Sequence, residues 1–247
     1  MNPLSSSQTK SLQISPIKVA TTLALIWSVI VFYGTLCQFI HLYFNIYLPG
    51  TELTYLDSEM NIPAIFSGFM LLLSSIIIGF VWYLERNLKN GKYWLILSGG
   101  FFFMFLEEIL EIHEKITAPI QEIIGHDHLG FFKYSWIIPY AIISLVVGLY
   151  FLKFLFSLPK ETTKRIFIAG IWYVMAALGI EGITGISADY FGNTDNFLYL
   201  AFMTIEEASE MYAISFFIFA LLSYIEQVHS GVSISFGTSH ESEKVMK

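Results

Sequence analysis

Long runs of apolar residues, separated by short polar connections, dominate the sequence. Each run is close to the roughly 20 residues with which an α-helix crosses the hydrocarbon core of a membrane. The runs cover about residues 19–41, 62–84, 94–113, 136–157, 166–187 and 198–224. This pattern predicts an all-α, polytopic membrane protein in which residues 18–228 form a single bundle of about six transmembrane helices.

The connections between the runs are short and carry turn-forming pairs such as Asn90-Gly91 and Gly192-Asn193. They leave no room for a second soluble domain. Residues 1–17 and 229–247 are polar and lack apolar periodicity, so we expect two flexible cytoplasmic tails.

Composition supports a membrane location and limits the kinds of partner that the protein is expected to have. Hydrophobic residues make up 55% of the chain and charged residues only 13%, which is too little polar surface for a soluble domain of this size. The expected partner is therefore the lipid bilayer. We find no nucleotide-binding loop, no nucleophile motif and no basic surface of the kind that binds nucleic acid. The sequence carries no indication of oligomeric state.

The basic residues predict how the helices are oriented. If the N-terminus is cytoplasmic, all of the 13 Lys and Arg residues except Lys115 and Lys133 fall on the cytoplasmic side. Short cytoplasmic loops retain Lys and Arg in this way. We therefore predict an integral protein of the plasma (inner) membrane with both termini in the cytoplasm.

The ionisable residues within the spans are mostly glutamates near the outer ends of the third, fifth and sixth spans. The candidates are Glu107, Glu108, Glu111, His113, Glu114, Glu181, Glu206, Glu207 and Glu210. At a rise of ~1.5 Å per residue, Glu107, Glu181 and Glu206 lie roughly 10–12 Å below the outer ends of their helices. The spacing therefore predicts one carboxylate layer, facing the outside or the periplasm.

Helical phase divides this layer further. Glu107, Glu111 and Glu114 follow an i, i+4, i+7 pattern and would share one helix face. Glu206 and Glu210 would share a second face, with Glu207 about 100° away. On an unbroken helix His113 would point off the acidic face.

An ionised carboxylate at membrane depth costs several kcal/mol, and only Lys115, at the rim, accompanies these glutamates. Protons or divalent cations must neutralise them. A Glu- and His-rich site suits Fe or Mn, and also Mg or Ca, so divalent metal ions are the expected cofactor. The Glu-x-x-His pairs that build di-metal centres in helical bundles do not occur in these spans, so this prediction rests on ligand chemistry.

Three functions follow from the layer and remain open. The first is a metal-dependent hydrolase or oxidoreductase that acts on a lipid or another hydrophobic small molecule. The second is a cation or proton transporter or channel. The inner halves of the spans contain few ionisable groups, and Lys153 and Glu226 lie near the inner rim. A path for ions through the membrane is therefore less favoured. The third is a structural or sensory subunit whose glutamates only fix helix packing.

Two of the acidic groups also have simpler interpretations. The segment from Glu111 to Glu114 would be an ordinary solvated helix end if the third helix left the membrane near Leu110. Glu181 would be a protonated side chain that bonds a neighbouring helix.

Overall fold

The computed structural model describes residues 15–58, 60–126 and 129–229, and every regular element in these ranges is helical. The predicted tails lie almost entirely outside the described residues. The elements are α1 (Pro16–Phe44), α2 (Thr51–Thr54), α3 (Ile62–Glu85), α4 (Gly91–Leu110), α5 (Ile112–Ile124), the 3₁₀-helix η1 (Gly130–Phe132), α6 (Ile137–Leu155), α7 (Lys160–Val174), the π-helix η2 (Met175–Ile180), α8 (Glu181–Phe191) and α9 (Phe197–Val228).

The predicted all-α fold is confirmed, and its described residues contain six candidate membrane-spanning helices. Among the described residues, six helices are long and apolar enough to cross a membrane: α1, α3, α4, α6, the continuous Lys160–Phe191 helix, and α9. The fifth of these contains α7, η2 and α8 in line, so a turn of π-helix lies inside one span. These six apolar helices indicate an integral membrane protein.

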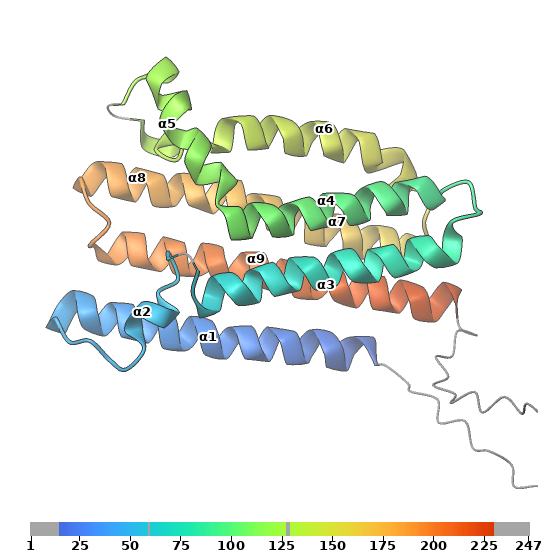
Figure 1. Ribbon diagram of the computed structural model, residues 1–247, viewed down its shortest axis with the longest axis horizontal. Coiled ribbons are helices and arrows are strands. Elements are labelled where there is room, and N and C mark those ends of the chain that lie inside the picture. The colour runs from blue at the N-terminus through green and yellow to red at the C-terminus, as the bar shows by residue number, and fades with distance from the viewer. Residues whose placement is uncertain (1–14, 59, 127–128, 230–247) are drawn as a thin grey trace, which may run out of the picture.

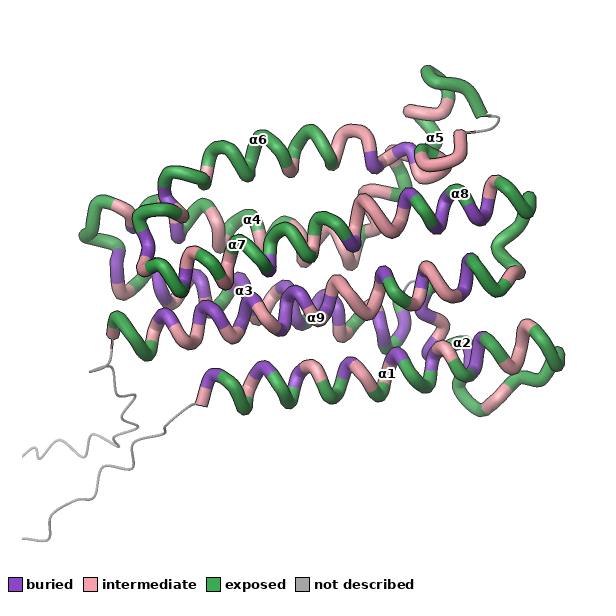
Figure 2. Tube along the Cα trace, turned by 180° about the vertical axis from the view of Figure 1, so that it is seen from behind, coloured by how far each residue is buried: buried purple, intermediate pink, exposed green. Residues whose placement is uncertain are grey.

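The long helices lie side by side, and α9 packs against α1, α3, α7 and α8 (Figure 1). Buried side chains run along the facing sides of α1, α3 and α9, where Trp27, Met70, Met211 and Ile218 belong to one hydrophobic cluster. In contrast, α6 is largely exposed and touches the bundle mainly through α7 and η2 (Figure 2). The glutamates lie towards the end of the bundle that holds α5 and the start of α9. We term this the outer end, in keeping with the predicted orientation.

The third span ends earlier than predicted. Helix α4 stops at Leu110, and Glu111 has a left-handed backbone conformation with φ 51°. A new helix, α5, then starts at Ile112 and leaves the bundle in another direction (Figure 1). The prediction that Glu107, Glu111 and Glu114 share one helix face is therefore wrong, because a left-handed residue breaks helical phase.

The loop that follows α1 packs closely onto that helix at Gly34. A Cβ atom at this position would collide with the carbonyl oxygen of Thr54 and crowd Leu56. We predict that Gly34→Ala destabilises the protein by about 1–3 kcal/mol, because a backbone carbonyl cannot rotate away as a side chain can. Thermal melting in detergent measures this loss.

Gly170→Ala in α7 is the matched control, since a Cβ atom there meets open space. It should melt at the wild-type temperature or slightly above, because Ala is the better helix former. Equal melting temperatures for Gly34→Ala and wild type would show that the loop is not held against α1 as described.

Candidate functional site

The first group in the glutamate layer joins the end of α4 to the start of α5. The backbone N–H of His113 donates to Glu107 Oε1 over 3.0 Å, and His113 Nδ1 lies 2.6 Å from the same oxygen. The hydroxyl of Tyr140, on α6, also donates to this oxygen at 3.0 Å. The left-handed turn at Glu111 brings His113 back to Glu107. His113 was expected to point off the acidic face only on an unbroken helix, and the break at Glu111 removes that condition.

His113 lies in α5, outside the membrane-spanning segments. Burial disfavours its charged form, but the hydrogen bond and negative charge of Glu107 outweigh burial and raise the pKa of His113 to about 9. The imidazole is therefore protonated at neutral pH. It supplies a positive charge that compensates Glu107.

This ion pair predicts a loss of stability at alkaline pH. The pKa of His113 is about 9 in the folded protein and about 6.5 in an unfolded chain. Its stabilisation is therefore complete below about pH 6.5 and disappears as the pH rises through about 9. Melting in detergent between these limits should show a loss of up to about 3 kcal/mol. His113→Gln should lack this component, and an identical alkaline loss in the variant would contradict the assignment.

The second group lies between α8 and α9. Glu206 is buried, and the Thr184 hydroxyl donates to its Oε2 over 3.0 Å. The carboxyl groups of Glu181 and Glu206 are within hydrogen-bonding contact of each other, and the Trp136 side chain also reaches Glu181. Two carboxyl groups in such contact need a shared proton or a cation between them.

The third group lies between α4 and α9. Glu108, Glu207 and Glu210 are close enough for their charges to interact, and the Ser67 hydroxyl is within hydrogen-bonding reach of Glu108. Among the described residues, no donor forms a hydrogen bond to Glu207 or Glu210, whereas Glu107 and Glu206 accept such bonds. These two carboxyls therefore lack the hydrogen bonds that compensate Glu107 and Glu206.

Two predicted site residues lie at the rim instead. Glu111 occupies the break between α4 and α5 and is half-buried, while Glu114 is exposed on α5. Among the described residues, neither side chain forms a hydrogen bond to a residue of the three glutamate groups. The nearby Lys115 ammonium donates to the carbonyl of Leu110, so it caps the end of α4.

Asp57, which the sequence analysis did not select, belongs to the outer edge of the layer. It lies in the loop before α3 and accepts a 2.6 Å hydrogen bond from the Tyr199 hydroxyl, which is 3.1 Å from that of Tyr134. Asp57 is exposed as a residue, but loss of solvation around its carboxyl raises the pKa of that group to about 6. The hydrogen bond from Tyr199 lowers the pKa, and the negative charges of Glu181 and Glu114 raise it.

A second carboxylate missed in the sequence lies at the opposite end of the bundle. Glu85, the last residue of α3, is only 4% exposed. It accepts hydrogen bonds from Trp94 Nε1 at 2.8 Å and the Tyr224 hydroxyl at 2.5 Å, and His229 Nε2 lies 3.0 Å away. The inner end therefore holds a buried carboxyl in addition to Lys153 and Glu226, contrary to expectation.

The glutamates thus form three neighbouring groups on α4, α8 and α9. In the part of the chain that the structure describes, no three His, Cys, Asp or Glu side chains are arranged to hold a metal ion. A shared metal centre would need carboxylate side chains to turn towards one another. Metal ligation by these residues stays a prediction.

Residues 19–224 match the model of a family described as a domain of unknown function (DUF8692). The match covers most of the chain, which therefore belongs to this family. No curated protein and no solved structure matches the chain.

Proposed function

We propose that this chain is a multi-pass membrane protein that binds a divalent cation between Glu108, Glu207 and Glu210 at its outer side. We further propose that the protein is a metal-dependent enzyme, which uses this ion to act on a hydrophobic molecule. The described helices would hold the site, with two carboxylates from α9 and one from α4.

The observation that carries the proposal is that Glu207 and Glu210, on the apolar α9 span, interact with the charge of Glu108 and accept no hydrogen bond from a described donor. Carboxylates without donors or basic partners cost several kcal/mol in such surroundings. A divalent ion compensates two of the three charges at once. Oxygen-rich ligand sets of this kind bind Mn, Fe, Mg or Ca.

The other two groups then have supporting roles. Protonated His113 compensates Glu107, and Thr184 orients Glu206 towards Glu181. A bound divalent ion would polarise a substrate oxygen or lower the pKa of a water molecule. Glu181 and Glu206, in mutual contact, are suited to hold and transfer a proton beside it.

Thermal melting with and without metal tests cation binding. Protein treated with a chelator and then given Mn²⁺ at about 100 times its dissociation constant should gain about 2.7 kcal/mol, because the ion binds only the folded state. Glu207→Gln should lose most of this gain. Glu114→Gln, in which an exposed carboxyl is removed, should keep it. Equal gains in stability for the two variants would show that Glu207 does not bind the ion.

Glu85 favours a second candidate, a cation or proton transporter. It places a buried carboxyl on α3 at the end of the bundle opposite the glutamate layer, where the Tyr224 hydroxyl of α9 donates to it. Flux in proteoliposomes that falls in both Glu210→Gln and Glu85→Gln would support transport. Metal binding without flux or turnover would instead indicate a structural or sensory role.

A further inference from the structure

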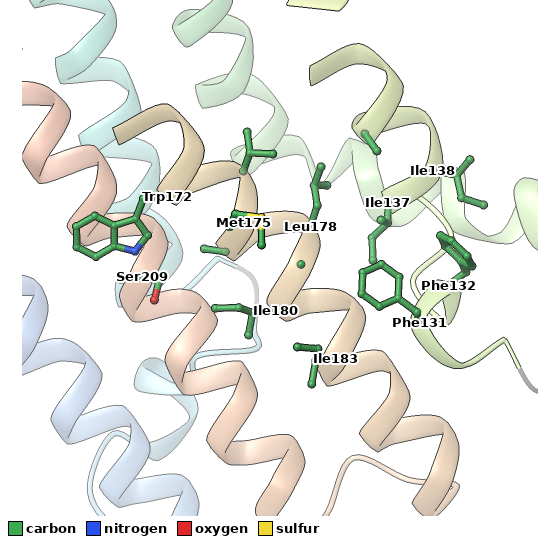
Figure 3. A pocket seen from close by; sticks show the side chains of 14 residues that line it. Phe131, Phe132, Ile137, Ile138, Trp172, Met175, Leu178, Ile180, Ile183 and Ser209 are labelled. Carbon is green, nitrogen blue, oxygen red and sulfur yellow. The ribbon is translucent and has the colours of Figure 1, made fainter. Parts of the chain in front are cut away.

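An apolar groove of about 890 Å³ lies across the middle of the fifth span. Its walls come from α6, the π-helix η2 and α9, as Figure 3 shows for Ile137, Met175 and Ser209. The volume falls within the range of roughly 300–1,000 Å³ that is typical of small-molecule sites. The groove is therefore large enough for a ligand rather than a packing defect.

The groove exists because α6 stands apart from the bundle and because η2 interrupts α-helical packing. A single turn of π-helix inside a longer helix occurs frequently at functional sites. Gly179, which lies on η2, adds no side chain to the groove, and a Cβ atom there would make only ordinary contact with Met175 at 3.4 Å. Since the walls belong to membrane-spanning helices, the groove opens towards hydrocarbon.

The polar end of the groove adjoins the glutamate layer. Ser209 is the one hydroxyl-bearing residue among the described lining residues. It lies one turn after Glu206 on α9, and positions i and i+3 are neighbours on a helix surface. On the other wall, Ile180 and Ile183 flank Glu181 in sequence. Ser209 therefore places the polar part of the groove about one helical turn from Glu206, which neighbours Glu181.

We propose that this groove binds the hydrocarbon chain of an amphiphile from the outer leaflet, with a hydrogen-bond-donating head, a hydroxyl or an amine, placed beside Ser209 and the Glu181–Glu206 pair. The apolar walls match the chain, and the carboxyl oxygens accept from the head. An anionic head is excluded from this position by the charge of the layer. The inference rests on the proposed function, because it names the substrate class of the same site.

Binding of tritiated hexadecylamine to the full-length protein in nanodiscs tests the groove. Gly179→Leu fills it from η2 and should weaken saturable binding at least about tenfold. Gly170→Leu adds the same side chain to α7, where a Cβ atom meets open space, and should bind as wild type does. Equal binding by wild type and Gly179→Leu would overturn the proposal.

Competition with two further probes tests the head group. Unlabelled hexadecanol should displace hexadecylamine from the wild type, whereas palmitate, with a chain of the same length and an anionic head, should compete at least about tenfold less well. Palmitate that competes as well as hexadecanol would overturn the assignment of the head group.

Metal content, measured on the same samples, separates the two proposals. Protein that binds hexadecylamine in the groove but contains no divalent metal contradicts the metal site alone. Protein that holds metal but shows no Gly179-dependent binding contradicts the groove alone.

Discussion

The double substitution Glu207→Gln and Glu210→Gln is expected to reduce bound divalent metal from about one ion per chain to less than about a tenth of an ion. Both side chains lack described hydrogen-bond donors and interact with the charge of Glu108, so they are the carboxylates with most need of a cation. Elemental analysis of protein purified without chelators measures the change.

The same variant should behave in the opposite way when metal is absent. In chelator, wild type must neutralise these carboxyls by taking up protons, which costs free energy at neutral pH, whereas the two amides are neutral and can donate hydrogen bonds. The double variant should therefore melt at a higher temperature than metal-free wild type. A variant that retains its metal, or that melts lower than chelated wild type, would show that these residues pack helices and bind no ion.

Removal of the inner carboxyl should cause the largest loss of stability. Glu85→Ala leaves the donors of Trp94 and Tyr224 buried without an acceptor and breaks the contact with His229. The loss of a buried, hydrogen-bonded charge typically costs about 3–5 kcal/mol. Denaturation in mixed micelles, followed by Trp fluorescence, would report this cost.

Glu226→Ala is the matched control, because Glu226 lies on the last turns of α9 and is exposed. It should change stability by less than about 0.5 kcal/mol. A similar small effect for Glu85→Ala would mean that α3, α4 and α9 are not joined through this carboxyl.

The number and place of the spans could be predicted because a membrane imposes one strong requirement, about 20 apolar residues in a helix. Residues 19–41 and 198–224, for example, lie within α1 and α9 of the structure. The ends of the spans were less accurate, since α9 continues to Val228 and α4 stops at Leu110. Apolar runs carry no information on where polar helix turns end.

The internal arrangement of the glutamate layer was predicted only in part. Depth along a helix follows from sequence position, and this predicted one layer at the level of Glu107, Glu181 and Glu206 on three helices. Helical phase failed after Leu110, because a left-handed residue such as Glu111 is rare outside glycine and asparagine. A sequence that continues with helix-forming residues gives no warning of it.

Asp57 and Glu85 were missed for a different reason. Each is defined by partners far away in the sequence, Tyr199 for Asp57 and Tyr224 for Glu85. Periodicity relates residues within one helix and cannot pair a loop residue or a helix end with another helix. One signal was available for the first pair, since Tyr199 precedes Glu206 by seven residues and shares its helix face.

The metal content of wild-type protein, purified from membranes in detergent without chelators, tests the central claim most directly. The account predicts about one divalent ion of Mn, Fe, Mg or Ca per chain, at an abundance that follows protein through size-exclusion chromatography. Less than about 0.5 ion per chain for every one of these metals, in protein with all of its glutamates intact, would contradict it.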